Sequence, residues 1–319
     1  MKKIGVLTSG GDASGMNAAI RAVVRFAIYN KLEVVGILRG YEGLINEEII
    51  PMNHRSVSNI INRGGTILKT ARSERFMTDE GQQRAVEVIK KNKIDGLVLV
   101  GGDGTYRGGH VLSTKWNIPC IGVPGTIDND LNGTDWTIGA DTAINVALDA
   151  IDKIRDTATS MERIFVVEVM GRDSGFIAIQ VALGSGSEEV VIPEKKFDLS
   201  SMCHEIVDGN IRGKVSWIII TAEGAMKAQE LAQKITENTD LETRVVVLGH
   251  VQRGGSPTAQ DRNLATRLGA ASVELLLKGE LDKAVGLVSD KLNVVSLEEA
   301  IKPKPIKVDE FYRLIKILT

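Results

Sequence analysis

Residues 118–130, Ile118-Pro-Cys-Ile-Gly-Val-Pro-Gly-Thr-Ile-Asp-Asn-Asp130, decide how this chain folds and where its chemistry lies. The apolar run as far as Val123 predicts a strand, and Pro124-Gly125 must end it, because proline and glycine interrupt both strands and helices. The polar residues that follow therefore form a loop at the carboxyl end of a strand, which is where open α/β sheets bind their ligands.

Two carboxylates, Asp128 and Asp130, lie two residues apart in this loop. Acids so close repel each other when buried, unless a cation, a proton or a hydroxyl donor lies between them. One acid doing proton transfer and one serving a metal or orienting a substrate is the functional interpretation. Because Asp and Asn are also good turn formers, an ordinary turn is the alternative.

A second acidic loop follows another apolar run. Residues 95–100 form a continuous apolar segment typical of a strand buried on both faces, and Gly101-Gly102-Asp103-Gly104-Thr105 comes directly after it. Asp103 is well placed to hold Mg²⁺ against a polyphosphate that the backbone amides cradle. A glycine-rich turn with a solvated Asp103 is the alternative.

A glycine loop also follows the first apolar run. Residues 3–7 predict a strand, residues 8–15 a glycine loop and residues 16–29 a helix, an order that suits phosphate binding at the helix N-terminus. The loop matches neither common nucleotide motif, and a tight structural turn is the alternative. Arg21 and Arg25 share one helix face, where like charges cost a few tenths of a kcal/mol unless an anion lies between them; a solvated face is the simpler interpretation.

Strand-like and helix-like segments alternate along the rest of the chain, which favours an α/β fold. Further strands are expected at 32–38, 164–170, 190–192, 216–221 and 244–248, and helices at 80–92, 142–159, 226–237 and 261–278. Residues 53–75 are irregular and basic, and Pro303-Lys304-Pro305 indicates a linker.

A second group of polar side chains is expected at strand ends in the later half of the chain. Its members are Arg172, Glu223, Arg244, His250 and Arg253. These groups suit sugar hydroxyls and bidentate phosphate binding. A single one is usually structural or solvated, whereas five at successive turns favour a binding site.

Composition narrows the function. A length of 319 residues suggests roughly two domains, and 43% hydrophobic and 25% charged residues are ordinary globular values. The net charge of -2 gives no reason to expect a nucleic-acid partner. The two cysteines, Cys120 and Cys203, lack zinc or redox spacing and are expected to be reduced structural thiols. No stretch approaches a membrane span, so we expect a soluble, cytoplasmic protein.

Together these features favour phosphoryl transfer from a nucleotide to a hydroxyl of a phosphorylated polyol. Asp128 would take the hydroxyl proton, while Mg²⁺ and cationic side chains stabilise the transferring group.

The chain resembles the bacterial ATP-dependent 6-phosphofructokinases over nearly its whole length. The stretches that carry the resemblance are 7–12, 101–104, 124–130, 152–157, 169–172 and Leu248-Gly-His-Val-Gln-Arg-Gly-Gly-Ser-Pro257. The resemblance implies two Rossmann-like three-layer α/β domains with mostly parallel sheets and an active site in the cleft between them. Residues 1–138 plus 252–304 would bind ATP, and residues 139–251 plus 305–319 would bind fructose 6-phosphate.

The resemblance also implies roles for individual residues. Asp128 would be the general base toward the sugar 1-hydroxyl, with Thr126 and Asp130 beside it, Gly11 and Arg172 at the transferred phosphate, and Asp103 on Mg²⁺. The residues implied at ATP are Gly11, Tyr41, Arg72, Ser73, Gly102, Asp103, Gly104, Thr105 and Gly108. Those implied at fructose 6-phosphate are Thr126, Asp128, Asp130, Met170, Gly171, Arg172, Glu223, His250 and Arg253, with Arg163 and Arg244 reaching the 6-phosphate from a neighbouring subunit.

The family implies a homotetramer with shared active and effector sites. Arg21, Arg25, Arg55, Arg155, Arg212 and Lys214, with Glu188 as a candidate metal or ligand contact, match an allosteric site where ADP activates and phosphoenolpyruvate inhibits. Gly104 and Gly125 favour ATP as donor, because the pyrophosphate-using relatives carry Asp and Lys there. The chain departs from the family pattern at Ser14, Asn59, Ala140, Met161 and Phe176, none of which is a proposed catalytic group. Asn59 stands near the implied effector arginines, where the family frequently has Asp.

Three other classes of protein share parts of this sequence pattern. A kinase of the NAD kinase or lipid kinase type shares Gly-Gly-Asp-Gly-Thr, but lacks the blocks at 124–130 and 249–255. An NADP-dependent dehydrogenase would use Arg39 at a 2′-phosphate, but the G-x-G-x-x-G motif is missing. A catalytically silent nucleotide sensor is disfavoured because Asp103 and Asp128 are both present.

Overall fold

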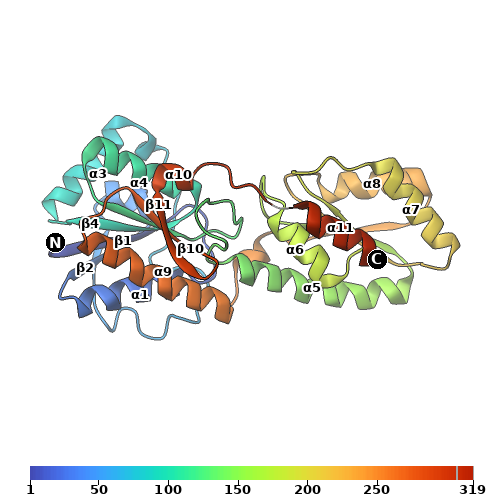
Figure 1. The fold of residues 1–319 in the computed structure, drawn as a ribbon, viewed down its shortest axis with the longest axis horizontal. Helices are drawn as coiled ribbons and strands as arrows, with labels where there is room; N and C mark the ends of the chain where they lie inside the picture. The colour runs from blue at the N-terminus through green and yellow to red at the C-terminus, as the bar shows by residue number, and fades with distance from the viewer. Residues whose placement is uncertain (307, 319) are drawn as a thin grey trace. The chain divides into compact units, whose positions relative to one another are not determined.

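The computed structural model describes residues 1–306 and 308–318 (Figure 1). The chain divides into two compact units, each built from two segments. Unit 1 is Met1–Thr142 with Arg253–Lys304, and unit 2 is Ala143–Gln252 with Pro305–Thr319. Which substrate each unit binds stays a prediction.

Unit 1 is built on a seven-stranded sheet in the order β11-β10-β5-β4-β1-β2-β3. The strands are β1 (Lys3–Ser9), β2 (Glu33–Ile37), β3 (Ile49–Met52), β4 (Gly96–Gly101), β5 (Cys120–Pro124), β10 (Lys283–Val288) and β11 (Lys291–Ser296). The five central strands, β10 to β2, run parallel, and the two edge strands β3 and β11 are antiparallel to their neighbours. Strands β4 and β5 are buried along their whole length, as their continuous apolar sequences predict.

Helices cover both faces of this sheet (Figure 1). The helices α1 (Met16–Tyr29) and α9 (Ala259–Leu277) pack together on one face. The helices on the other are α2 (Gly40–Ile45), α3 (Asp79–Lys91), α4 (Asp103–Trp116) and α10 (Leu297–Ala300), and a 3-10 turn lies at η1 (Arg75–Met77). A second 3-10 turn, η2 (Gly249–Arg253), begins in unit 2 and ends at the first residue of the second segment of unit 1. Helix α3 begins where the Thr78 side chain accepts from the Gly81 N–H, and lysines occupy its last turn, where they complement the helix dipole.

Unit 2 has a four-stranded, all-parallel sheet in the order β7-β8-β6-β9. Its elements are β6 (Ile164–Val169), β7 (Glu189–Val191), β8 (Trp217–Ala222), β9 (Thr243–Val247), α5 (Ala140–Met161), α6 (Phe176–Ser185), α7 (Leu199–Ile211), α8 (Ala228–Thr239) and α11 (Val308–Leu318). Helices α7 and α8 lie on one face of the sheet and α5, α6 and α11 on the other (Figure 1). None of the described helices has both the length and the apolar character that a bilayer crossing requires.

The predicted α/β class with mostly parallel sheets is confirmed. The expected helix at 16–29 matches α1 residue for residue, and residues 53–74, after β3, form no helix or strand. Sequence reasoning missed the β10–β11 hairpin, whose turn is made by Ser289 and Asp290, both with positive φ, in place of the glycine that usually marks such a turn. It also missed β3 and α2, which are short, and α11, although residues 308–318 have a clear helical spacing of apolar side chains.

Cys120 and Cys203 are both free and buried, as expected. Burial raises the pKa of the Cys120 thiol to about 12 and also raises the pKa of Cys203. The thiolate is the reactive form, so neither side chain has the exposure or the ionisation of a nucleophile.

We therefore expect the native protein to react slowly with a colorimetric thiol reagent at mildly alkaline pH. The protein unfolded in guanidinium chloride serves as the control and should release two thiol equivalents at once, since both cysteines are then exposed. Rapid labelling of either thiol in the native protein would contradict the placement of that side chain.

Candidate active site

Three neighbouring parallel strands of unit 1 end at the same edge of the sheet. Ser9 of β1 pairs with Gly101 of β4, and Gly101 pairs with Pro124 of β5. The Gly125 N–H also donates to the Gly101 carbonyl at 3.0 Å. The loops at 9–15, 101–105 and 124–130 therefore start side by side, and we call them the three-loop edge.

The first loop is held by contacts from distant parts of unit 1. Thr70 donates to the Gly10 carbonyl at 2.7 Å, and Arg253 donates to the Asp12 carbonyl at 3.1 Å. The loop ends at Gly15, whose φ of 113° favours glycine, and helix α1 starts there without a side-chain cap. Uncapped N–H groups at a helix start are suited to an anion.

Asp103 begins helix α4 in the second loop. Gly102 precedes it and supplies no side-chain cap, so the helix N-terminus is built from backbone amides and one carboxylate. The Asp103 side chain is 39% exposed, and its Oδ1 lies 3.0 Å from Arg107 Nε one turn along. No group of three or more His, Cys, Asp or Glu side chains that could hold a metal occurs in the described part of the chain. A single carboxylate beside phosphate-binding amides nevertheless fits Mg²⁺, which takes most of its ligands from water and phosphate.

Gly104 is exposed at the start of α4, whereas Thr105, Gly108 and Tyr41, which the resemblance also implies at ATP, are buried beneath it. A Cβ atom at Gly104 would meet nothing within 4 Å. Thr105 is buried and donates to the Ser9 carbonyl at 3.0 Å, and the buried Tyr41 donates to the Thr105 carbonyl at 2.5 Å. A Cβ at Gly108 would come within 2.6 Å of the Tyr41 ring. The side chains of Tyr41 and Thr105 thus support the loop from inside.

Asp128 lies in the third loop, with only 2% of its surface exposed. Its N–H donates to Thr126 Oγ1 at 3.2 Å. A Cβ at Gly102 would lie 3.4 Å from Thr126 Cβ, so the second and third loops are in contact. The structure therefore places Asp103 and Asp128 on neighbouring loops that touch each other.

Arg253 packs on the first loop. A Cβ at Gly11 would lie 2.4 Å from Arg253 Nη1, so a larger residue there would displace this guanidinium. The segment that carries Arg72 and Ser73 is tied to the same region through Thr70, and Ser73 donates to Glu42 at 2.6 Å. Arg72 itself is exposed.

In unit 2, the turns after β6 and β8 are joined by Glu223. Its Oε1 accepts from the backbone N–H of Gly171 at 3.3 Å and of Arg172 at 3.0 Å. A Cβ at Gly224 would lie 1.9 Å from the Arg172 carbonyl oxygen, so the two turns touch. The Met170 N–H donates to the buried Gln252 at 2.8 Å. We call these residues the Glu223 cluster; Gln252 is a member that sequence reasoning missed, although it lies within the block at 248–257.

Arg163 and Arg244 lie at the opposite end of the same sheet. Arg163 directly precedes β6, and Arg244 is the second residue of β9. Both pair with Glu242, with Arg163 Nε 2.8 Å from its carboxylate. The expectation that Arg244 follows a strand's carboxyl end together with Glu223 is therefore wrong: Arg244 lies at the start of β9, and this strand runs from there toward the Glu223 cluster. Sequence reasoning did not single out Glu242, whose charge holds the two arginines together.

Comparison with known proteins shows the family to which this chain belongs. The sequence profile of the phosphofructokinase family, described as "Phosphofructokinase", matches residues 3–276. The chain belongs to the phosphofructokinase family. It is 53% identical to the ATP-dependent 6-phosphofructokinase of Halothermothrix orenii and 54% identical to that of Oceanobacillus iheyensis, in both cases over the full length of both chains.

Solved phosphofructokinases share the fold. The Saccharomyces cerevisiae enzyme superposes with a TM-score of 0.88 at 35% identity, over 94% of this chain and 45% of the yeast chain. A pyrophosphate-dependent phosphofructokinase from Marinobacter aquaeolei superposes with a TM-score of 0.84 at 25% identity, over all of this chain and 91% of the other. The name of the Marinobacter aquaeolei enzyme specifies pyrophosphate, whereas the two sequence relatives above are named ATP-dependent, so the shared fold is compatible with either donor.

The predicted effector residues of this phosphofructokinase-family chain fall into two groups. In unit 2, Arg155 donates to the Ser185 carbonyl at 2.8 Å, and Lys214 lies 3.3 Å from the buried Glu188. Arg212 is close in sequence to Lys214 and lies 3.7 Å from Asp208. These contacts gather cations near the end of α6, where chain residues 185–188 turn.

The second group lies in unit 1. Arg21 and Arg25 are half-buried on α1, and burial, with a smaller contribution from Arg25, lowers the pKa of Arg21. The repulsion that the sequence predicts between these two charges is therefore present in the fold. Arg55 is exposed on the loop after β3.

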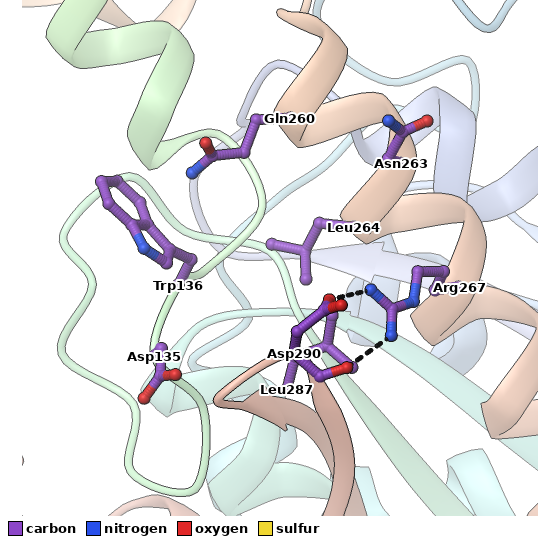
Figure 2. A pocket seen from close by; sticks show the side chains of 8 residues that line it. All are labelled: Asp135, Trp136, Gln260, Asn263, Leu264, Arg267, Leu287 and Asp290. Atoms are coloured by element: carbon purple, nitrogen blue, oxygen red, sulfur yellow. Dashed lines mark hydrogen bonds and ion pairs between the residues drawn. The ribbon is translucent and has the colours of Figure 1, made fainter.

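A pocket of about 500 Å³ in unit 1 lies outside these groups (Figure 2). It is lined by Asp135, Trp136, Gln260, Asn263, Leu264, Arg267, Leu287 and Asp290, none of which is a predicted site residue. Arg267 donates to the Asp290 carbonyl at 2.7 Å and Asp135 accepts from the Ser289 N–H at 2.7 Å, so charged groups of this pocket are engaged with protein. Nothing links the pocket to phosphoryl transfer.

Proposed function

We propose that this protein transfers a phosphoryl group from MgATP to the 1-hydroxyl of D-fructose 6-phosphate, giving fructose 1,6-bisphosphate and ADP. This reaction is the committed step of glycolysis. The observation that carries the proposal is the contact between the Asp103 and Asp128 loops at one edge of the unit 1 sheet. The names of full-length relatives at 53% and 54% identity support the same reaction.

Unit 1 would bind the nucleotide. The uncapped starts of α1 and α4 offer backbone N–H groups to phosphates, and the open surface at Gly104 leaves room for a polyphosphate chain. Arg72 and Gly11 would contribute from the adjoining loops. Mg²⁺, held by Asp103, would neutralise charge on the phosphates during transfer.

Asp128 would act as the general base. Its loop position is fixed and it is nearly buried, which are the properties of a side chain that must meet one hydroxyl in one geometry. Thr126 and Asp130 would orient the sugar beside it, and Arg172 would stabilise the charge of the transferring phosphoryl group.

The Glu223 cluster would hold the sugar. Glu223 ties the turns that present Met170, Gly171 and Arg172, and the exposed His250 follows β9 at the same end of the sheet. Arg253 would add a cation from the 249–258 segment. These donors suit hydroxyls and a phosphate.

The opposite placement of Arg163 and Arg244 supports sites that are shared between the subunits of a homotetramer. Within one chain, these arginines lie a strand's length from the Glu223 cluster, so they would reach the 6-phosphate in another subunit's site. Strand β9 is a sheet edge, and Val247 and Val251 are 48% and 61% exposed beside it. An exposed apolar edge of this kind is suited to subunit contact.

Regulation and location are further parts of the proposal. The cations at Arg21, Arg25, Arg55, Arg155, Arg212 and Lys214, with Glu188, would bind the phosphates of ADP as activator and the anionic phosphoenolpyruvate as inhibitor. Half-burial of Arg21 beside Arg25 gives an anion a favourable place, because it would relieve their repulsion. A cytoplasmic location stays a prediction.

A coupled assay for fructose 1,6-bisphosphate tests the reaction directly. Purified protein is supplied with fructose 6-phosphate and Mg²⁺, and either ATP or pyrophosphate. We expect product with ATP and little with pyrophosphate. Absence of product with ATP would reject the proposed function.

Asp128→Ser should lower kcat by about 10²- to 10⁴-fold, the usual contribution of a positioned base, while fructose 6-phosphate binding is largely kept. The coupled assay gives kcat, and calorimetry gives the sugar's dissociation constant. Asp135→Asn, a change at an exposed carboxylate of the same connection, is the matched control and should keep normal turnover. Near-normal kcat in Asp128→Ser would refute the base assignment.

Arg163→Ser should chiefly weaken fructose 6-phosphate binding, because the lost guanidinium is proposed to contact the 6-phosphate across a subunit boundary. The KM for this sugar should rise by at least about tenfold, the loss of one charge-assisted contact, with a smaller change in the KM for ATP. Arg84→Ser, which removes an exposed arginine paired with Glu87 in unit 1, is the control. An unchanged sugar KM counts against the shared site.

Gly104→Asp should fold normally, because a side chain at this position enters open space, yet it should raise the KM for ATP strongly by placing a carboxylate among phosphates. Gly104→Ala adds only a methyl group to the same space and is the control. If Gly104→Asp binds ATP as tightly as the parent, the nucleotide does not pass over the start of α4.

A further inference from the structure

A fully buried carboxylate lies outside the residues assigned to the reaction. Asp261, in the first turn of α9, is 0% exposed and uses both of its oxygens. Oδ1 accepts from the Gly139 N–H at 2.8 Å, and Oδ2 accepts from the Thr142 N–H at 2.8 Å and from Thr142 Oγ1 at 2.5 Å. The carboxylate thus holds the start of α5, where the connection from β5 ends.

The starts of α5 and α9 are tied together reciprocally. Thr258 Oγ1 accepts from the Asp261 N–H at 3.3 Å and donates to Asp141 at 2.6 Å. The Thr258 N–H donates to Thr142 Oγ1 at 3.1 Å. Each helix start therefore caps the other, and neither can shift without breaking bonds in the other.

The bonds at Gly139 continue into the loop that carries Asp128. The neighbouring Ile138 N–H donates to the Pro124 carbonyl at 2.8 Å, and Thr137 Oγ1 donates to the Thr126 carbonyl at 2.6 Å. A Cβ at Gly139 would lie 3.3 Å from Ile127 Cγ2. The 125–139 loop therefore leaves the sheet after β5 and folds back so that its last residues bind its first residues. Asp261 holds the end of this loop at Gly139.

Asp261 also lies beneath the first loop of the three-loop edge. A Cβ at Gly15 would lie 3.5 Å from Asp261 Cβ. Ser14 donates to the carbonyls of Gly254 and Gly255 at 3.1 and 2.9 Å, on the segment that leads into α9. One buried side chain thus adjoins both the glycine loop and the Asp128 loop.

Burying a charged carboxylate at this position costs free energy, but no other side chain would satisfy the same three donors. Burial raises the pKa of Asp261 to about 6, against the opposing effect of its three hydrogen bonds, and nearby Asp141 raises the pKa further. An asparagine would keep the shape but would turn an NH₂ group toward a backbone N–H, leaving a buried donor without an acceptor. Only the carboxylate accepts from all three donors.

We propose that Asp261 is a positioning residue for the phosphoryl transfer proposed above: its carboxylate fixes the return of the 125–139 loop and thereby places Asp128. It touches neither substrate nor the reacting atoms. This inference rests on the proposed function, but its structural half, the fixing of the loop, can be tested without turnover.

The kinetic test is Asp261→Asn. Because a displacement of about 1 Å at a base costs up to about 10²-fold, kcat should fall about 10- to 100-fold, while the KM for ATP stays within about threefold. Asn263→Ala alters an exposed side chain two residues along the same helix (Figure 2) and should leave both constants unchanged. Thermal unfolding checks that each variant is folded at the assay temperature.

A second pair of variants keeps the test decisive if Asp261→Asn fails to fold. Thr142→Val removes one of the three donors and should lower kcat by a smaller factor, whereas Thr142→Ser keeps the hydroxyl and should restore it. Equal kcat for the Val and Ser variants would overturn the proposal. So would an Asp261→Asn protein that is less heat-stable but turns over within about twofold of the parent, since this is what a merely structural cap predicts.

Hydrogen exchange of the loop amides supplies the readout that does not depend on activity. Asp261→Asn should speed exchange at Gly139 and Thr142, and also at Thr137 and Ile138 in the returning strand of the loop. Lowered kcat with parental exchange at these amides would overturn the positioning role. If the parent protein makes no fructose 1,6-bisphosphate, the proposed function fails, and the exchange comparison still decides whether Asp261 holds the loop.

Discussion

The parallel hydrogen bonding of β1, β4 and β5 is the constraint on which the proposed chemistry depends. Parallel pairing with Ser9 opposite Gly101 and Gly101 opposite Pro124 makes all three strands end at one edge. A shift of one residue in any of these strands would move its loop by about 3.3 Å and turn every side chain to the opposite face of the sheet. The separation of Asp103 from Asp128 is therefore set by the backbone before any side chain is considered.

The strands of unit 2 are also parallel, but here the predicted site residues lie at both ends of the sheet. Its four parallel strands also gather turns at one end, where Glu223 holds the backbone of Arg172. Glu242 pairs with both Arg163 and Arg244 at the far end. Within one chain, the length of the parallel strands therefore separates Arg163 and Arg244 from the Glu223 cluster.

The sequence predicts the elements that repeat a simple period and the loops that interrupt them. Helix α1 and the buried strands β4 and β5 follow directly from apolar patterns, and glycines next to Asp103 and Asp128 mark the loops. Partners far apart in the chain could not be predicted this way. Glu242, Gln252 and Asp261 acquire their roles only through residues that the fold brings to them. Arg244 was grouped with the turns although it lies at the start of the expected strand, where its partner Glu242 could not be predicted from the pattern.

Close packing favours glycine at several positions in the three-loop edge and beside it. A Cβ atom would lie 2.4 Å from the Arg253 side chain at Gly11, 2.6 Å from Ile138 at Gly15 and 2.6 Å from Ala13 at Gly139. Each distance is shorter than any stable contact. A larger residue at Gly15 or Gly139 must push one loop segment away from another, whereas at Gly11 it would displace the Arg253 side chain. Because Gly15 and Gly139 also have positive φ, their substitution would be strained even after such a movement. The buried hydrogen bonds of Asp261 act on loops whose spacing the glycines have already fixed, and the two constraints together leave the Asp128 loop a single well-packed position.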